Sequence, residues 1–555
     1  MSSPLDLTDI AAGMGGFVIR GEFFDDRSGF SVASAGDING DGFADLIIGA
    51  PYAAPPFQGA RQGGSYVVLG KPDGWASPID LADIAVGNGG FVIHGHEGGT
   101  WSGWSVSSAG DVNGDGFADL LIGAPRGDVD PNNPFPDTGA SYVVFGKATG
   151  WGAPVDLAAI SAGIGGFGIF GRDVGDGAGG SVASAGDVNG DGFGDLIIGV
   201  WSSDAGSNLK NYAGESYVVF GKAGSWGSGV DLSAVAVGTG GFVIYGEDAF
   251  DQSGFSVASA GDVNGDGFAD LIIGAPFGDG AGNLKDRAGD SYVVFGKASG
   301  WGAPIDLSDV AAGVGGFVIH GRDAGISNVI SGDYSGRSVA SAGDINGDGF
   351  SDLIIGAPLG GAAGNLVEAA GESYVIFGKA SGWGAPIDLA TIAAGDGGFV
   401  IYGEEIVDLS GNSVASAGDV NGDGFDDLII GAYRGDGAGN LRGNAGDSYV
   451  IFGKASGWGA PVDLTEIAAG VGGFVIHGNQ SNGLSGFSVA SAGDLDGDGF
   501  DDLIIGAPNS PVSVYWAFMH YAGESYVVFG RDFTNTVTHA GTASADALSG
   551  TAGGN

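Results

Sequence analysis

One unit is repeated seven times along the sequence, and this repeat constrains the fold more than any other feature. The segment 36–43 (Gly-Asp-Ile-Asn-Gly-Asp-Gly-Phe) returns with its first aspartate at Asp111, Asp187, Asp262, Asp344, Asp419 and Asp494. The successive intervals are 74, 76, 75, 82, 75 and 75 residues. One closed array of such units can hold all 555 residues, so the length does not require three or four domains. A period of this size suits a propeller blade with long loops.

Each unit contains four strand-like runs, which in the first copy are residues 17–19, 30–34, 45–49 and 65–69. β-branched and aromatic residues fill these runs, and Gly, Pro, Asn or Asp bound them. The third run is apolar at consecutive positions, as expected for a strand covered on both faces. The second run carries small residues, which suit a crowded central axis. We therefore expect an all-β fold, a seven-bladed β-propeller of four-stranded antiparallel blades.

A connector containing tryptophan follows the fourth run in six of the units, at Trp75, Trp151, Trp226, Trp301, Trp383 and Trp458. We expect these rings to pack between blades and a short helical turn to follow, as at residues 156–160. The repeat stops after Arg531. The propeller is therefore expected to span residues 1–531, with a flexible tail at residues 532–555.

The repeated aspartate segments have the composition of calcium-binding loops. Oxygen-bearing side chains occupy loop positions 1, 3, 5 and 9, and the carbonyl of a phenylalanine is available at position 7. Ca²⁺ takes six to eight oxygen ligands, and a glycine at position 6 permits the sharp bend that brings the later ligands round. The loops are 37–45, 111–119, 187–195, 262–270, 344–352, 419–427 and 494–502. The expected ligands are Asp37, Asn39, Asp41, Phe43, Asp45; Asp111, Asn113, Asp115, Phe117, Asp119; Asp187, Asn189, Asp191, Phe193, Asp195; Asp262, Asn264, Asp266, Phe268, Asp270; Asp344, Asn346, Asp348, Phe350, Asp352; Asp419, Asn421, Asp423, Phe425, Asp427; and Asp494, Asp496, Asp498, Phe500, Asp502.

Two other interpretations of these loops are less satisfactory. Asn-Gly between strands also marks a plain β-hairpin, but a hairpin does not need three aspartates within nine residues, and their repulsion opposes folding without a cation. An EF-hand closes at position 12 and is followed by a helix, whereas here the closing carboxylate is at position 9 and a strand follows. We expect about seven Ca²⁺ ions, one per blade, in preference to Mg²⁺.

The charge balance narrows the possible partners. Asp and Glu number 66 and Lys and Arg 19, giving a formal net charge of −47. Such a field excludes nucleic acid as a partner, and no apolar run of about 18 residues is present to insert into a membrane. Cysteine is absent, so no thiolate metal site is expected. The first residues lack the basic and apolar regions of a signal peptide, so we expect the export signal to lie outside this chain.

The repeated motifs resemble the FG-GAP repeat of integrin α-subunit propellers and of related bacterial proteins. The resemblance rests on Phe-Ser-Val-Ala-Ser-Ala-Gly-Asp, Asn-Gly-Asp-Gly-Phe and Asp-Leu-Ile-Ile-Gly-Ala-Pro, and covers residues 5–531. It implies a propeller in which residues 17–19 form the outer strand of the last blade, beside residues 525–529, and in which ligand is recognised on the face opposite the calcium loops. All seven units carry the loop, no cysteine is present, and the tail from His539 resembles the entry to hemolysin-type calcium repeats. These features favour a monomeric module of a bacterial surface or secreted protein over an animal receptor.

The connections expected on the opposite face differ between copies and contain the candidate contacts. A protein or glycan ligand is expected there, since variable loops on a uniform scaffold concentrate binding function. The best aromatic cluster is Tyr515, Trp516, Phe518, His520 and Tyr521. Two Arg-Gly-Asp tripeptides, at residues 126–128 and 434–436, are interpreted as part of the repeat, because Gly-Asp also occurs at residues 278–279.

No catalytic residues are expected, although an enzyme remains the alternative. His94, His320 and His477 share one repeat position, which suits the surface of an outer strand. The acidic pairs 25–26, 247–248 and 404–405 could serve a polysaccharide lyase or glycosidase, but are interpreted as solvated loop charges. A structural spacer in a large surface protein is the other alternative.

Overall fold

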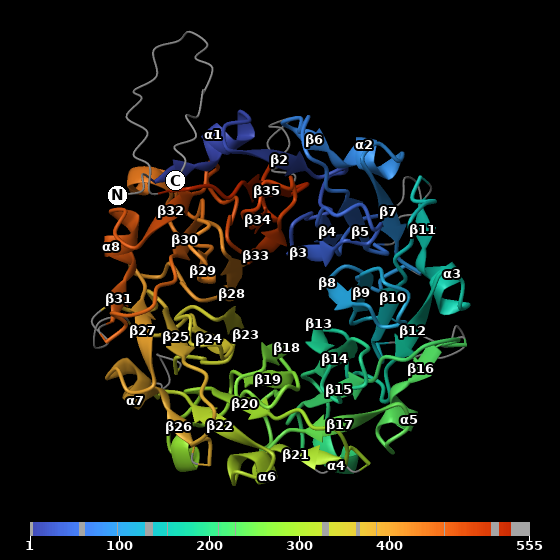
Figure 1. Ribbon diagram of the computed structural model, residues 1–555, viewed down its shortest axis with the longest axis vertical. Coiled ribbons are helices and arrows are strands. Elements are labelled where there is room, and N and C mark those ends of the chain that lie inside the picture. Colours follow the sequence, from blue (N-terminus) through green and yellow to red (C-terminus); the bar gives the residue numbers. More distant parts are fainter. Residues whose placement is uncertain are drawn as a thin grey trace, which may run out of the picture.

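The computed structural model describes residues 4–533 except 55–60, 97, 128–136, 153, 209, 228, 303, 325–331, 362–366, 385, 460 and 512–520. Seven sheets stand in a ring around a central axis, with short helices on the outer rim (Figure 1). The expected seven-bladed propeller is therefore confirmed. No helix in the described ranges is long and apolar enough to cross a membrane.

Four strands of each blade pair antiparallel, from the axis outward. The innermost strands, in blade order, are β3 (Ser31–Gly36), β8 (Ser105–Gly110), β13 (Ser181–Gly186), β18 (Ser256–Gly261), β23 (Ser338–Gly343), β28 (Ser413–Gly418) and β33 (Ser488–Gly493). The second strands are β4 (Asp45–Ala50), β9 (Asp119–Ala124), β14 (Asp195–Val200), β19 (Asp270–Ala275), β24 (Asp352–Ala357), β29 (Asp427–Ala432) and β34 (Asp502–Ala507). The third strands are β5 (Gly64–Val68), β10 (Ala140–Val144), β15 (Glu215–Val219), β20 (Asp290–Val294), β25 (Glu372–Ile376), β30 (Asp447–Ile451) and β35 (Glu524–Val528). The fourth strands are β7 (Gly90–His94), β12 (Gly166–Phe170), β17 (Gly241–Tyr245), β22 (Gly316–His320), β27 (Gly398–Tyr402), β32 (Gly473–His477) and β2 (Gly16–Arg20).

The expectation of four strands per blade was wrong, because each sheet has a fifth, short strand at its outer edge that pairs parallel with the fourth. Six of the fifth strands belong to the connector that follows the next blade's third strand, and the other, at residues 5–6, precedes the strand that closes the last blade; each therefore ties two blades together. Its two or three residues are too few to show an alternating pattern in the sequence. In blade order these strands are β11 (Val155–Asp156), β16 (Gly229–Asp231), β21 (Ile305–Asp306), β26 (Ile387–Asp388), β31 (Val462–Asp463), β1 (Leu5–Asp6) and β6 (Ile79–Asp80).

A helical turn follows each fifth strand, as the connector sequence predicts. In six of the seven turns the aspartate that ends the strand caps the turn, Asp80 being the exception; the Oδ1 atom of Asp156, for example, accepts a hydrogen bond from the amide of Ala158 at 2.8 Å. The turns are α1 (Leu7–Ala11), α2 (Leu81–Ala85), α3 (Leu157–Ser161), α5 (Leu232–Val235), α6 (Leu307–Ala311), α7 (Leu389–Ala393) and α8 (Leu464–Ala468). Three further turns lie in the connections between second and third strands: α4 (Ala205–Asn208), η1 (Ala281–Asn283) and η4 (Ala438–Asn440).

The hydrophobic core is divided into seven clusters, each shared by two neighbouring blades. Between the first and second blades, Ile47 and Phe91 pack with Leu120, Ile122 and the connector residue Trp151. The ring of Trp151 stacks on Phe91 with centroids 4.4 Å apart. The interpretation of the tryptophans as anchors between blades is therefore confirmed, and it explains why the second strands are buried along their whole length.

A seventh anchor completes the set. Phe533 stacks on Phe474 of β32 with centroids 4.6 Å apart, as the tryptophans stack on the matching phenylalanines elsewhere. A phenylalanine therefore takes the place of the seventh tryptophan. Residues 534–555 lie outside the described part of the chain.

The N-terminal segment closes the ring, as expected from the family resemblance. Strand β2 pairs antiparallel with β35, with Phe17 opposite Val527, and β1 pairs parallel with β32. At the axis, a serine of each innermost strand accepts a hydrogen bond from a valine amide of the next. The last of these bonds runs from the Val32 amide to the Oγ atom of Ser488 at 3.1 Å. The first and last blades are thus joined at the axis and at the rim.

Strand alternation divides the connections between two faces. The aspartate loops join first to second strands and lie on the same face as the tryptophan connectors, which we call the loop face. The connections from second to third strands and from one blade's fourth strand to the next blade's first strand lie on the other side, the variable face.

Candidate metal centres

The aspartate at position 1 organises each loop. In the first loop, the Oδ1 atom of Asp37 accepts hydrogen bonds from the amides of Gly40 and Asp41 at 2.6 and 3.1 Å, and its Oδ2 atom accepts from Gly42 at 2.9 Å. The same three bonds recur in the other six loops. Gly42 has φ +92° and open space around it, so the backbone conformation alone accounts for the glycine.

The aspartate at position 9 is the most deeply buried of the predicted ligands. Asp45 is 0% exposed, and its two carboxylate oxygens accept hydrogen bonds from the amides of Ile38 and Gly70 at 3.1 and 2.8 Å. Burial, together with the charges of the neighbouring Asp41 and Asp37, raises the pKa of Asp45 to about 7. A buried carboxylate held against two other acidic groups gains more from a bound cation than an exposed one does. The equivalent pKa is raised to about 7 in Asp119, Asp195, Asp270 and Asp352, and to about 8 in Asp427 and Asp502.

The side chain at position 3 lies beside that buried carboxylate. In the sixth loop, Nδ2 of Asn421 is 3.2 Å from Oδ2 of Asp427. The Oδ1 atom of Asn421 is buried and has no hydrogen-bond partner. An unsatisfied buried oxygen at a predicted ligand position is consistent with a cation site.

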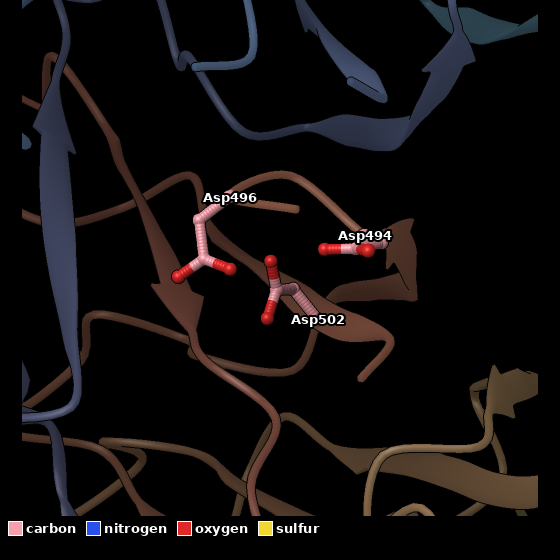
Figure 2. A group of neighbouring side chains, drawn as sticks. All are labelled: Asp494, Asp496 and Asp502. Atoms are coloured by element: carbon pink, nitrogen blue, oxygen red, sulfur yellow. The ribbon is translucent and has the colours of Figure 1, made fainter. Parts of the chain in front are cut away.

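The seventh loop brings three carboxylates together. Asp494, Asp496 and Asp502, at positions 1, 3 and 9, have oxygen atoms within 4.8 Å of one another. Figure 2 shows these three side chains close together, with that of Asp502 drawn between those of Asp496 and Asp494. Burial and the nearby Asp498 raise the pKa of Asp496. Because all the donors are oxygens and most are carboxylates, the set fits a hard divalent cation.

Position 5 lies outside that trio. The carboxylate of Asp498 accepts a hydrogen bond from the amide of Phe500 at 3.0 Å, and the first loop has the same contact between Asp41 and Phe43. The aspartates at position 5 are exposed in every loop. Their coordination of metal, and that of the phenylalanine carbonyls at position 7, remain predictions.

The phenylalanine at position 7 has a second role that the sequence did not reveal. Its ring covers the glycine at position 4 of the preceding blade's loop: a Cβ atom at Gly40 would lie 2.6 Å from Cε1 of Phe117. The amide of Ala118 also donates to the carbonyl of Asp37 at 3.2 Å. The contact of phenylalanine with glycine recurs between all seven pairs of neighbouring loops and the backbone hydrogen bond between six of them, so neighbouring loops hold one another in place. The repeated pairing of Gly at position 4 with Phe at position 7 was the available signal.

The candidate ligand cluster on the variable face falls largely outside the described residues. Tyr515, Trp516, Phe518 and His520 lie in the range 512–520, and Tyr521 forms an isolated bridge with Pro511. In the second Arg-Gly-Asp segment, the Oδ1 atom of Asp436 accepts a hydrogen bond from the Asn444 amide at 2.9 Å. Asp279 makes the same contact with Arg287, which supports the interpretation of Gly-Asp as part of the repeat. Asp128 of the first tripeptide is outside the described range.

The acidic pairs were expected to be solvated loop charges, but one member of each pair is buried or hydrogen-bonded. Asp26 is 2% exposed and accepts a hydrogen bond from the Phe23 amide at 3.1 Å, and burial raises its pKa to about 7. Glu247 and Glu404 accept hydrogen bonds from the hydroxyls of Tyr292 and Tyr449. One member of each pair thus satisfies polar groups inside the variable face.

The histidines at the shared repeat position end the outer strands, as expected. Nδ1 of His320 lies 2.8 Å from Oδ1 of Asp290, and His477 lies at the same distance from Asp447. These contacts are made between the facing ends of the third and fourth strands.

Comparison with known proteins agrees with this architecture. Integrin alpha pat-2 of Caenorhabditis elegans is 31% identical over 47% of this chain and 18% of its own length. Integrin alpha-V of Gallus gallus is 30% identical over 47% of this chain and 20% of its own length. Phosphatidylinositol-glycan-specific phospholipase D of Bos taurus is 27% identical over 78% of this chain and 46% of its own length. The chain thus spans less than half of each of these relatives.

A family model described as "FG-GAP repeat" matches seven segments, which together make up more than half of the sequence: residues 28–68, 102–144, 178–219, 253–294, 335–376, 410–451 and 485–528. Each segment runs from the entry of a first strand through the aspartate loop to the third strand. The chain therefore belongs to the FG-GAP repeat family, with a propeller that resembles those of integrin α-subunits.

Proposed function

We propose that this protein is a calcium-dependent recognition or adhesion module that works outside the cell and binds a protein or glycan through its variable face. The observation that carries the proposal is the contrast between the two faces. The loop face repeats one set of side chains and contacts seven times, whereas the connections on the variable face differ in length and composition. Repetition suits a structural metal site, and variation suits recognition.

Calcium is the cation that the loop chemistry favours. Each loop offers several oxygen donors in a strongly acidic setting, and Mg²⁺ requires a stricter octahedral arrangement. Calcium is abundant outside cells, where affinities of about 10⁻⁴–10⁻³ M are sufficient for extracellular modules. Relatives named as integrin α-subunits agree with that location.

The calcium proposal is tested by titration calorimetry of the metal-free protein. We expect about seven sites, and we expect Asp352→Asn, which removes a buried ligand, to lose one of them. Asp396→Asn is a matched control, because Asp396 is exposed on the connector side of the same face and its replacement removes the same charge. Seven sites retained in Asp352→Asn, or a melting curve unchanged by excess EGTA, would contradict the proposal.

We further propose that the chain binds without catalysing a reaction. His320 and His477 are paired with aspartates, and the buried acidic groups described above are held by amides and tyrosine hydroxyls. Some relatives are named phosphatidylinositol-glycan-specific phospholipase D, but the match covers only 26% and 46% of two such proteins. That name therefore gives no reaction to this segment.

Recognition is tested by screening glycan and protein arrays in the presence of Ca²⁺ and then grafting loops. Blade 4 offers a donor connection, residues 276–289, that is fully described. Replacing the second-to-third-strand connections of the other blades with it should abolish binding and leave calcium binding intact. Binding that survives the grafts, and is lost only when the tryptophan connectors are altered, would place recognition on the loop face.

A further inference from the structure

A pocket on the variable face lies between the second and third blades. Its volume is about 400 Å³, which falls within the range of about 300–1,000 Å³ typical of small-molecule sites. Its walls come from the entry to β8, the connections that follow β9 and β14, and the loop between β12 and β13. The aromatic residues that line it are Trp101, Trp104, Trp201 and Tyr212.

This pocket gathers the tryptophans that the repeat does not require. Six of the ten tryptophans lie in connectors, and three of the remaining four line the pocket. Trp101 and Trp104 stack with centroids 5.2 Å apart and planes inclined by 15°. Both rings are partly exposed. Both rings also contact aromatic residues of the first blade, Phe30 and Tyr52, but neither occupies the connector position that the repeat fixes.

The opposite wall is formed in the third blade, where two residues, Trp201 and Gly180, differ from those of the other copies. Trp201 occupies a position where the other copies have Pro or Tyr, and Gly180 occupies one where they have Phe, Trp, Arg or Asn. The two changes fit together, since a Cβ atom at Gly180 would lie 2.8 Å from Nε1 of Trp201. The glycine thus makes room for an indole ring that faces the pocket.

The polar groups of the pocket carry balanced charges, although the chain as a whole carries −47. Arg126 lies over the Trp101 ring, with its guanidinium carbon 3.7 Å from the ring centroid. The polar residues Asp137 and Ser202 also line the pocket. Arg126 and Trp104 both pack against the Trp101 ring, so a ligand cation is not favoured there.

We infer that this pocket binds a sugar residue of an uncharged glycan, which rests on the recognition function proposed above. A pyranose ring has a face of C–H groups that can pack on indole rings, and a rim of hydroxyls that both donate and accept hydrogen bonds. The pocket offers a matching arrangement: Trp104, Trp201 and Tyr212 as apolar surfaces, Trp101 holding the guanidinium of Arg126, and the polar residues Asp137 and Ser202 beside them.

The test uses the full chain with Ca²⁺ and a panel of defined neutral oligosaccharides: maltohexaose, cellohexaose, xylohexaose, mannohexaose and chitohexaose. Binding is followed by calorimetry and by tryptophan fluorescence. We expect at least one oligosaccharide to bind, and we expect Trp101→Ala and Trp201→Ala each to weaken it tenfold or more. Tyr334→Ala is the matched control, because Tyr334 occupies the same loop position in the fifth blade and does not line this pocket.

The other outcomes separate this inference from the proposed function. Glycan binding that resists both tryptophan changes but is lost on loop grafting elsewhere would overturn the pocket and leave the recognition function standing. If no oligosaccharide binds, but an array protein, polylysine or choline does and its binding is lost in Trp101→Ala, the pocket is a binding site and the assignment of a glycan as its ligand is refuted. No binding by any oligosaccharide or array component would overturn both.

Discussion

The closure of the ring by the N-terminal segment can be tested with one matched pair of substitutions. Phe17 lies in β2 and stacks on Trp75 with centroids 4.6 Å apart and planes inclined by 8°. Phe399 occupies the same position in β27 and stacks on Trp458 at 4.5 Å and 12°. The two side chains are 0% and 1% exposed. They differ in that β27 follows its partner strand in the chain, whereas β2 and β35 lie at opposite ends.

The expected loss is the same for both variants. Replacing a buried phenylalanine by alanine costs about 3–5 kcal/mol through lost burial and the cavity left behind. If β2 is held as firmly as the other fourth strands, Phe17→Ala and Phe399→Ala should each lower the free energy of unfolding by that amount, and the two losses should agree within about 1 kcal/mol.

Urea unfolding at saturating Ca²⁺, followed by circular dichroism, provides the measurement. A full loss in Phe399→Ala with less than about 1 kcal/mol in Phe17→Ala would show that the N-terminal strand adds little, and would refute closure by β2. Similar losses in both variants would show that the ends of the chain meet in one sheet of normal strength.

A deletion extends the same reasoning. Removing residues 1–21 removes five buried apolar side chains, Leu7, Ile10, Phe17, Val18 and Ile19. At about 1.5–3 kcal/mol each, their burial is worth about 7–15 kcal/mol, which is the size of a typical domain's net stability of about 5–15 kcal/mol. The deleted protein should aggregate through the exposed edge of β35. A stable monomer in light scattering would contradict this.

Three further outcomes are expected. Because burial raises the pKa of the position-9 aspartates to about 7 or 8, above the ordinary 3.8, the metal-free protein takes up protons on folding, and its urea midpoint should rise as pH falls from 8 towards 4. Saturating Ca²⁺ competes with those protons and should reverse this pH dependence. In EGTA, a urea midpoint that becomes lower as the pH is lowered from 8 towards 4 would contradict the prediction. Gly40→Ala should destabilise more than Gly42→Ala in urea unfolding, because both have positive φ but only Gly40 is covered by a phenylalanine ring; equal losses would argue against contact between loops. Phe533→Ala should lower the melting temperature in scanning calorimetry as Trp458→Ala does, since each ring stacks on a fourth strand; no change would exclude Phe533 as the seventh anchor.

The periodicity of the sequence was sufficient to predict the ring, the first four strands of each blade and the anchoring tryptophans. These features repeat, so each copy confirms the others. The fifth strands were missed because a segment such as Ile79–Asp80 has no room for an alternating pattern. Phe533 was missed because both its residue type and its spacing depart from the repeat: it lies three residues after Gly530, whereas Trp458 lies five residues after Gly453.

The site was predictable only in part, for related reasons. The nine-residue spacing indicated which side chains face one another, and the seventh loop brings Asp494, Asp496 and Asp502 together. Spacing does not show which carboxylates are buried, so the raised pKa at position 9 was not foreseen. The tryptophan pocket was missed because Trp101 and Trp201 are 100 residues apart and become neighbours only when two blades pack.

The two faces also differ in how freely they can change, and the contacts explain why. On the loop face, each phenylalanine covers a glycine of the preceding blade, so a change in one loop must be matched in the next, and the seven loops constrain one another around the ring. On the variable face, Gly180 and Trp201 show that a large exchange can be accommodated within a single blade. The first aspartates of the fourth and fifth loops, Asp262 and Asp344, are 82 residues apart, whereas the other intervals are 74 to 76 residues. Added length is therefore tolerated there as well. A repeat protein built in this way can alter its binding surface blade by blade while its metal loops stay the same.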